Sequence, residues 1–346
     1  MRPLTPRRVL LVCGGLAAVL FAAVVISLKV GAYPITVADT VMTLLRGSVG
    51  DWRQIPSSDS LIIFGLRLPR IALGILVGAA LSVAGASFQA LLRNPLADPY
   101  VLGVSNGAAL GAILALLVSP HLSLLPAVAD LLTPLGAFLG AAATIAAVYF
   151  LGRREGQIDS TTLLLGGVIT GSFLAAIIMF LMTSETGSNL RGMAYWLMGN
   201  LSTSLQPTVY WILWIGFLLG AGAIYTTASD LNLLLSGEKE AMHLGVDLPR
   251  VRLVVYIAAS LLTGLAVSVS GSIGYVGLLV PHVMRQIFGS DHRVLLPTAA
   301  FGGAIAVVIA DTIGRTVVPP AELPVGAMTA LAGAPLFIYL LRRRMA

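Results

Sequence analysis

The hydrophobic positions of this chain come in long uninterrupted blocks, separated by short segments that carry Gly, Pro or charge. A helix needs about 20 consecutive apolar residues to cross the hydrocarbon core of a bilayer. The pattern therefore predicts an all-α polytopic membrane protein with a single transmembrane domain over residues 1–346. About ten spans are expected, near 9–30, 68–91, 101–118, 134–151, 162–183, 207–227, 251–271, 273–288, 294–317 and 325–341.

Composition excludes a water-soluble globule. Hydrophobic residues make up 57% of the chain, charged residues only 10%, and the mean hydropathy is +0.94. A soluble domain carries about 25% charged residues. The net charge of +6 is attributed to Arg-rich loops on the cytoplasmic side, so no nucleic-acid partner is expected.

The distribution of Lys and Arg predicts the orientation. With both termini inside, fourteen of the 21 positive residues lie on the inner side. This bias agrees with the preference of positive residues for the cytoplasm. The outer side would carry Lys29, Arg46, Arg53, Arg67, Arg70, Arg191 and Arg315.

The N-terminal block is expected to be a retained first span. Its apolar run from Val9 to Leu28 is too long for the apolar core of a cleaved signal peptide. The single cysteine, Cys13, lies in this run and is interpreted as a small helix residue.

Glycine positions indicate close helix packing and one internal repeat. Small residues let helix backbones approach in lipid. Residues 78–85 and 264–271 match at Gly, Ala, Ser, Val and Gly, on the second and seventh predicted spans. These spans run in opposite directions, which suggests an inverted repeat of five plus five spans, as in many transporters.

The chain lacks catalytic and metal-binding motifs. No catalytic residues, phosphate-binding loop or metal-ligand spacing occur in the sequence, so any ATP hydrolysis must take place on another chain. This speaks against a membrane enzyme or receptor subunit. An ion-coupled secondary transporter stays an alternative, but such carriers place carboxylates within the membrane, and only Asp311 lies clearly inside an apolar stretch.

Several motifs, in order along nearly the whole chain, resemble those of the FecCD family of ABC-importer permeases. They are Arg67-Leu-Pro-Arg70, the run from Leu92 to Gly107, the run from Gly274 to His282, Asp291 to Pro297, Ala310-Asp311, Glu322-Leu-Pro324 and Gly333-Ala-Pro335. The resemblance implies the permease subunit of a type II ABC importer for haem, iron-siderophores or cobalamin. It implies a homodimer in the bacterial inner membrane, two cytoplasmic ATPase subunits that hold ATP and Mg, a periplasmic binding protein, and no cofactor on this chain.

The resemblance assigns roles to three outer arginines. Arg67, Arg70 and Arg315 would dock the binding protein through its glutamates, because a guanidinium group offers a planar fork of donors to a carboxylate. Anchoring at the lipid headgroups is the alternative for these residues.

The resemblance also implies a coupling helix, which inserts into a groove of the ATPase, in the cytoplasmic loop 229–250; a solvated loop is the alternative. Gly237 and Gly245 bracket a helix-forming stretch with acidic residues in its first turn. The predicted contacts with the ATPase are Glu238, Glu240, Met242 and Leu244, together with the two glycines.

Two inner turns resemble the cytoplasmic gate of the family. The first contains Asn94 and Leu96, and the second contains Ser160 and Thr161. Ordinary connecting turns are the alternative. In the second turn Asp159 stands where a neutral polar residue would be expected, so the gate assignment fits this turn less well.

The substrate path is expected along the fifth and tenth spans. Phe173, Met179, Phe180 and Met182 would form a soft apolar wall, which suits a large flat ligand such as haem. Haem is the favoured cargo, with an iron-siderophore or cobalamin as alternatives. Packing against lipid or protein would explain the same residues.

Overall fold

The computed structural model describes residues 6–31, 33, 35, 36, 40, 42, 43, 58–122, 126–154, 157–202, 205–318 and 321–345. Arg46 and Arg53, which the charge distribution assigns to the outer side, lie outside the described residues.

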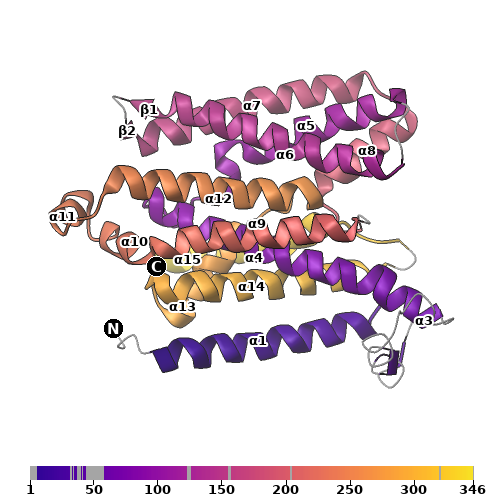
Figure 1. Cartoon of the computed structure of the whole chain (residues 1–346), viewed down its shortest axis with the longest axis horizontal. Helices are drawn as coiled ribbons and strands as arrows, with labels where there is room; N and C mark the ends of the chain where they lie inside the picture. The colour runs from indigo at the N-terminus through magenta and orange to yellow at the C-terminus, as the bar shows by residue number, and fades with distance from the viewer. Residues whose placement is uncertain are drawn as a thin grey trace.

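The chain folds into a bundle of helices that run side by side (Figure 1). The first half contains α1 (Pro6–Lys29), α3 (Ser58–Ser60), η2 (Leu61–Arg67), α4 (Leu68–Leu91), η3 (Pro99–Leu102), α5 (Val104–Val118), η4 (Ser119–His121), α6 (Pro126–Leu151), β1 (Arg153–Arg154), β2 (Gln157–Ile158) and α7 (Ser160–Thr183). The second half contains α8 (Gly187–Met198), α9 (Pro207–Thr226), α10 (Ala228–Leu234), α11 (Glu238–His243), α12 (Leu248–Ser270), α13 (Val276–Phe288), α14 (His292–Gly314) and α15 (Val325–Met345).

Each of the ten predicted stretches falls on a helix in the structure. Among the described residues, eight helices are long and apolar enough to cross a membrane, while α13 and α15 offer shorter apolar helices. The chain is thus an all-helical polytopic membrane protein, apart from the two-residue antiparallel pair β1–β2. The sequence pattern did not predict this pair, nor the short helices α3, α8 and α10.

The two ends of the bundle carry different segments. In Figure 1 the chain termini, β1–β2 and α11 gather at the left end, and α3 and α8 lie at the right end. The left end therefore holds the segments that the charge distribution assigns to the cytoplasm, and the right end holds those assigned to the outside.

Helix α4 is the centre of the bundle, with nearly all of its residues from Ile71 to Leu91 buried. It packs against α12, α13 and α14. Glycine makes the closest approach possible, because a Cβ on Gly78 would lie 2.1 Å from the carbonyl oxygen of Gly303 on α14. The glycines of this helix therefore serve backbone packing, as expected in lipid.

One pair of matched glycines packs against partners that correspond across the predicted repeat. Gly78 on α4 packs against Gly303 on α14, and Gly264 on α12 packs against Ala141 on α6. The second span thus contacts the ninth, and the seventh contacts the fourth. The other pair does not correspond in this way, because Gly85 lies against Gly277 of α13 and Gly271 lies against Trp196 of α8. The first pair agrees with an inverted five-plus-five repeat, which stays a prediction.

Candidate functional site

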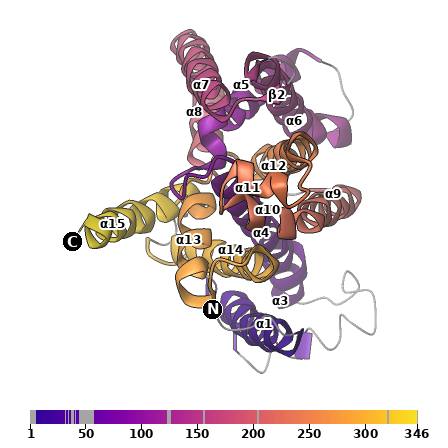
Figure 2. The ribbon, with the colours of Figure 1, turned by 90° about the vertical axis from the view of Figure 1, so that its left-hand side faces the viewer.

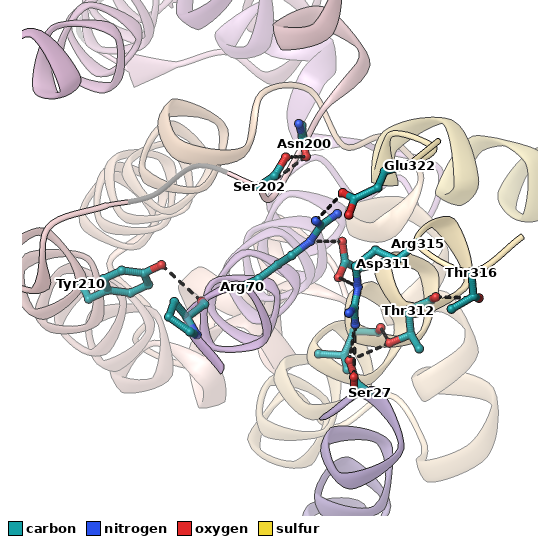
Figure 3. Close-up of polar contacts among 12 residues, drawn as sticks. Ser27, Arg70, Asn200, Ser202, Tyr210, Asp311, Thr312, Arg315, Thr316 and Glu322 are labelled. Atoms are coloured by element: carbon teal, nitrogen blue, oxygen red, sulfur yellow. Dashed lines mark hydrogen bonds and ion pairs between the residues drawn. The ribbon is translucent and has the colours of Figure 1, made fainter. Parts of the chain in front are cut away.

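A cluster of charged side chains lies where α4 begins and α14 ends. Arg70 donates from Nε to Asp311 Oδ1 at 2.9 Å and from Nη1 to Glu322 Oε2 at 2.6 Å. Asp311 is buried, the Arg70 side chain is 11% exposed, and Glu322 is 49% exposed. Figure 3 shows Arg70 reaching from α4 toward both carboxylates. One guanidinium group thereby joins α4, α14 and the segment that precedes α15.

Asp311 is shared with a second arginine. Arg315 Nε donates to Asp311 Oδ2 at 3.1 Å, and Arg315 Nη2 donates to the Ser27 hydroxyl at 2.8 Å. Arg315 is buried at 6% exposure. A buried carboxylate between two guanidinium groups leaves one positive charge to be balanced, and Glu322 is the acid that balances it.

Arg67 is buried at the outer end of α1. Its guanidinium group donates to the carbonyl oxygen of Leu28 at 2.5 Å and to that of Tyr33. The last carbonyls of a helix have no partner within the helix, and positive charge near them is favourable. Arg67 therefore caps α1.

Two of the three arginines that are predicted to dock the binding protein are buried in the structure, and docking by all three stays a prediction. Arg67 and Arg315 are buried, and both bond to the end of α1, since Arg315 also reaches the carbonyl oxygen of Ser27 at 3.3 Å. Their donors point into the protein, toward groups near the end of α1. Only Arg70 reaches toward the surface, and it does so through its pair with Glu322.

A polar hollow of about 140 Å³ opens beside Glu322. Its wall includes Tyr195 of α8 and the Asn200–Ser202 turn, in which the Ser202 hydroxyl donates to Asn200 Oδ1. Figure 3 shows this turn above the end of Arg70. The remaining lining residues are Leu323 and Pro324. The space is larger than the roughly 10–15 Å³ that one water needs, so the hollow has room for a small polar group.

At the opposite end, α11 has the form that the sequence predicts. Gly237 (φ +135°) precedes the helix and Gly245 (φ +88°) follows it. Met242 is 53% exposed and Leu244 65% exposed. Glu238 instead pairs with Arg252 on α12 at 2.5 Å.

The Glu240 carboxylate folds back over Gly237, where a Cβ would lie 1.9 Å from Oε2. The exposed apolar surface of this helix is therefore made by Met242 and Leu244. The side chain of Glu238 is 40% exposed, Glu240 is exposed as well, and the contact of these two acids with the ATPase stays a prediction.

The segment around α11 is bound to the start of α14. Asn232 on α10 donates to Asp291 Oδ1 at 2.7 Å and accepts from the backbone N–H of His292 at 2.8 Å. Hydrogen bonds from Arg293 lower the pKa of Asp291, which caps α14, to about 2. The carboxylate thus stays charged in neutral solution and fixes α10 to α14.

The two predicted gate turns are tight local structures. Asn94 Oδ1 accepts from the backbone N–H of Leu96 at 2.9 Å. Asp159 caps α7, which begins at Ser160, and accepts from the backbone N–H of Thr162 at 2.7 Å. Thr161 is exposed in the first turn of α7. Leu96 lies beside a small hollow together with residues of α13 and α15, among them His282 and Phe337.

The four predicted path residues on α7 do not share one face. Phe173, Met179 and Phe180 are 65%, 68% and 71% exposed. Met182 instead packs against the apolar cluster that contains Ile113 of α5 and Met193 of α8. Seen along the bundle axis, α7 and α15 both project from the body of the molecule (Figure 2).

Sequence reasoning did not give Asp311, Glu322, Asn200 and Ser202 a role at this site. Asp311 is the acid inside an apolar stretch, and such an acid is expected to pair with a positive residue. The sequence could therefore have predicted an ion pair between Asp311 and one of the arginines assigned to the outer side. Nothing in the local sequence around Asn200 indicates that it lines a hollow.

Comparison with known proteins places this geometry in a class. The sequence profile of the FecCD transport family matches residues 19–343. The cobalamin import system permease protein BtuC of Halobacterium salinarum is 42% identical over 84% of this chain and 76% of its own length. The hemin transport system permease protein HmuU of Yersinia pestis is 40% identical over 82% of this chain and 84% of its own length.

A solved structure has the same fold. It is an inward-facing conformation of an ABC transporter assigned to the metal-chelate type, with a TM-score of 0.79 and 32% identity, over 96% of this chain and 98% of that chain. The uncharacterized ABC transporter permease protein YvrB of Bacillus subtilis is 47% identical over 82% of this chain and 79% of its own length.

The fold, with charged sites at both ends of a helical bundle, defines a membrane-spanning transport subunit. The chain belongs to the FecCD transport family. It is therefore a permease subunit of an ABC importer, which works with a separate ATPase that binds the ATP and with a substrate-binding protein. This membership sets aside the ion-coupled secondary transporter and the membrane enzyme.

Proposed function

We propose that this permease carries a metal chelate, with haem as the favoured cargo, from the outer side to the cytoplasm between two copies of itself. Both termini would face the cytoplasm, in the inner membrane of a bacterium. The observation that carries the proposal is that α7 and α15, the fifth and tenth predicted spans, project from the body of the molecule (Figure 2) with exposed apolar side chains.

Helix α15 supports a path between two copies. Leu331, Ile338 and Tyr339 are 69%, 55% and 59% exposed, and the helix contacts the rest of the chain through α8, α13 and α14. With Phe173 and Phe180 of α7, these side chains offer apolar surface that a second copy would cover. A path at such an interface would be lined from both sides.

The chemistry of this surface favours haem. Ligand sites are lined mostly by apolar and aromatic side chains with few polar groups, and Met adapts to irregular ligand shapes. Phe173, Met179 and Phe180 supply such a wall for a planar macrocycle. Cobalamin is the second candidate, because the Halobacterium relative, named for cobalamin import, is 42% identical.

Groups at the two ends of the helical bundle support the proposed partners. At the outer end, Arg70 would receive an acidic side chain of the binding protein. At the inner end, Met242 and Leu244 would enter a groove of the ATPase. Leu96, together with Ser160 and Thr161 at the start of α7, would close the path on the cytoplasmic side.

Stimulation of the ATPase tests the cargo. The permease, its ATPase and its binding protein are assembled in nanodiscs, and ATP turnover is measured with the binding protein empty, loaded with hemin or loaded with cyanocobalamin. Hemin should stimulate turnover most. Stimulation by cyanocobalamin alone would exclude haem as the cargo.

A further inference from the structure

Glu322 differs in two ways from the other charged groups of the outer cluster. It is half exposed, whereas Arg70, Asp311 and Arg315 are at most 11% exposed. It also comes from the segment just before α15, not from a packed helix. Its carboxylate is therefore the member of the cluster that can leave Arg70 without breaking the helix packing.

The hollow lies beside Glu322, the carboxylate that Arg70 holds, and offers room for a second carboxylate next to it. Its polar lining includes Asn200 and Ser202, and Glu322 forms part of its wall (Figure 3). An incoming carboxylate could take the place of Glu322 on Nη1 of Arg70, while Asp311 keeps its bond to Nε at 2.9 Å. The exchange keeps the charge balance of the buried pair.

The segment that carries Glu322 is linked directly to α15. The backbone N–H of Leu323 donates to the carbonyl oxygen of Gly314 at 3.0 Å, and that of Gly326 donates to the carbonyl oxygen of Gly199 at 3.3 Å. A Cβ on Gly326 would lie 2.2 Å from the carbonyl oxygen of Met198. The outer end of α15 is thus held against α14 and the end of α8 next to Glu322.

We propose that Glu322 occupies Arg70 in the free permease as an internal stand-in for an acidic side chain of the binding protein. Docking replaces Glu322, and its release loosens the outer end of α15. This inference rests on the proposed docking at Arg70, and it adds a mechanism by which docking reaches the path. Because an internal competitor lowers the apparent affinity by the fraction of sites it leaves open, removing Glu322 tightens docking.

Binding affinity tests the exchange. The substrate-binding protein of the same importer is titrated onto the permease in nanodiscs, for wild type, Glu322→Gln, Arg70→Lys and the double variant. Glu322→Gln should bind about threefold to fivefold tighter, the range of a partly exposed ion pair. Arg70→Lys should bind more weakly, because Lys lacks the fork that serves two carboxylates at once. In the double variant, the gain in affinity that Glu322→Gln causes should be largely lost.

A matched control separates the exchange from general charge effects. Glu185→Gln removes the same charge from the predicted outer side, where the Glu185 carboxylate accepts from Asn189 instead of an arginine. It should leave the affinity unchanged. An equal gain in this control, or a gain from Glu322→Gln that persists in Arg70→Lys, overturns the exchange.

Hydrogen exchange of the Leu323 and Gly326 amides gives a second measurement. Both should exchange faster in wild type when the binding protein is docked, and in Glu322→Gln already without it. If Arg70→Lys weakens docking but Glu322→Gln alters neither affinity nor exchange, the proposal for Glu322 is wrong and docking at Arg70 stands. If neither variant alters affinity, docking at Arg70 is itself wrong.

Discussion

The guanidinium group of Arg70 on α4 holds the carboxylate of Asp311 on α14 with 2.9 Å between Nε and Oδ1, across 241 positions of sequence. The pair joins the two helices whose backbones meet at Gly78 and Gly303. Asp311 also binds Arg315, so one buried carboxylate secures two arginines at the outer end of the bundle.

Replacing Asp311 by Asn should destabilise the permease strongly. The change leaves two buried guanidinium groups without their shared acid, and breaking a buried pair costs about 3–5 kcal/mol. Thermal unfolding in detergent measures the loss. Arg250→Gln, at an exposed position in the first turn of α12, serves as the control and should change stability by about 0.5 kcal/mol or less. Equal stability of Asp311→Asn and wild type would show that the cluster does not hold the helices.

Substitution of Arg67 or Arg315 should lower the stability of the permease before it affects docking of the binding protein. Arg67→Gln and Arg315→Gln remove charged donors from the end of α1, and a hydrogen bond to a charged group is worth about 1.5–3 kcal/mol. Unfolding temperature should fall for both variants. Arg191→Gln is the control, because Arg191 is an exposed residue of α8 on the predicted outer side. Unchanged stability together with lost binding of the binding protein would return these two arginines to direct docking.

The sequence was sufficient for the helices and insufficient for these arginines. Apolar blocks such as 68–91 define helices directly, because the bilayer requires that length. A charged residue at the end of a block reveals neither where it points nor which carbonyl groups end nearby. Arg67 bonds to Leu28, which lies 39 positions away, and that contact depends on how α1 and α4 pack.

The same limit applies to the path residues. Phe173, Met179, Phe180 and Met182 are all apolar residues of one helix, and the sequence alone does not tell which face of that helix is covered. The fold separates them, since Met182 is half-buried against the cluster that contains Ile113 of α5 and Met193 of α8, while the other three are exposed.

Met242→Ala with Leu244→Ala should weaken binding of the ATPase. These side chains make the exposed apolar surface of the α11 segment, and truncating a central interface residue costs about 2 kcal/mol or more. Co-purification and the coupling of ATP turnover to the binding protein provide the measurement. Leu122→Ala, an exposed leucine at the end of η4, is the matched control. If the double variant retains the full amount of ATPase, the coupling surface lies elsewhere.

Gly78→Ala should loosen the core of the bundle. A Cβ at this position lies 2.1 Å from the carbonyl oxygen of Gly303, so α4 and α14 must move apart, and overpacking costs about 1–3 kcal/mol. The unfolding temperature should drop. Gly14→Ala on α1 has no atom within 4 Å of the new Cβ and should behave as wild type. A neutral Gly78→Ala would contradict the packing described for these helices.

ATP-driven uptake into proteoliposomes tests the central claim most directly. The permease is reconstituted with its ATPase, the binding protein is supplied on the side of Arg70, and hemin accumulation is measured on the side of α11. We predict that hemin accumulates when ATP, the ATPase and the binding protein are all present, and that omitting any one of them abolishes it. Hemin accumulation without the ATPase, or accumulation of cyanocobalamin with no uptake of hemin, would contradict the account.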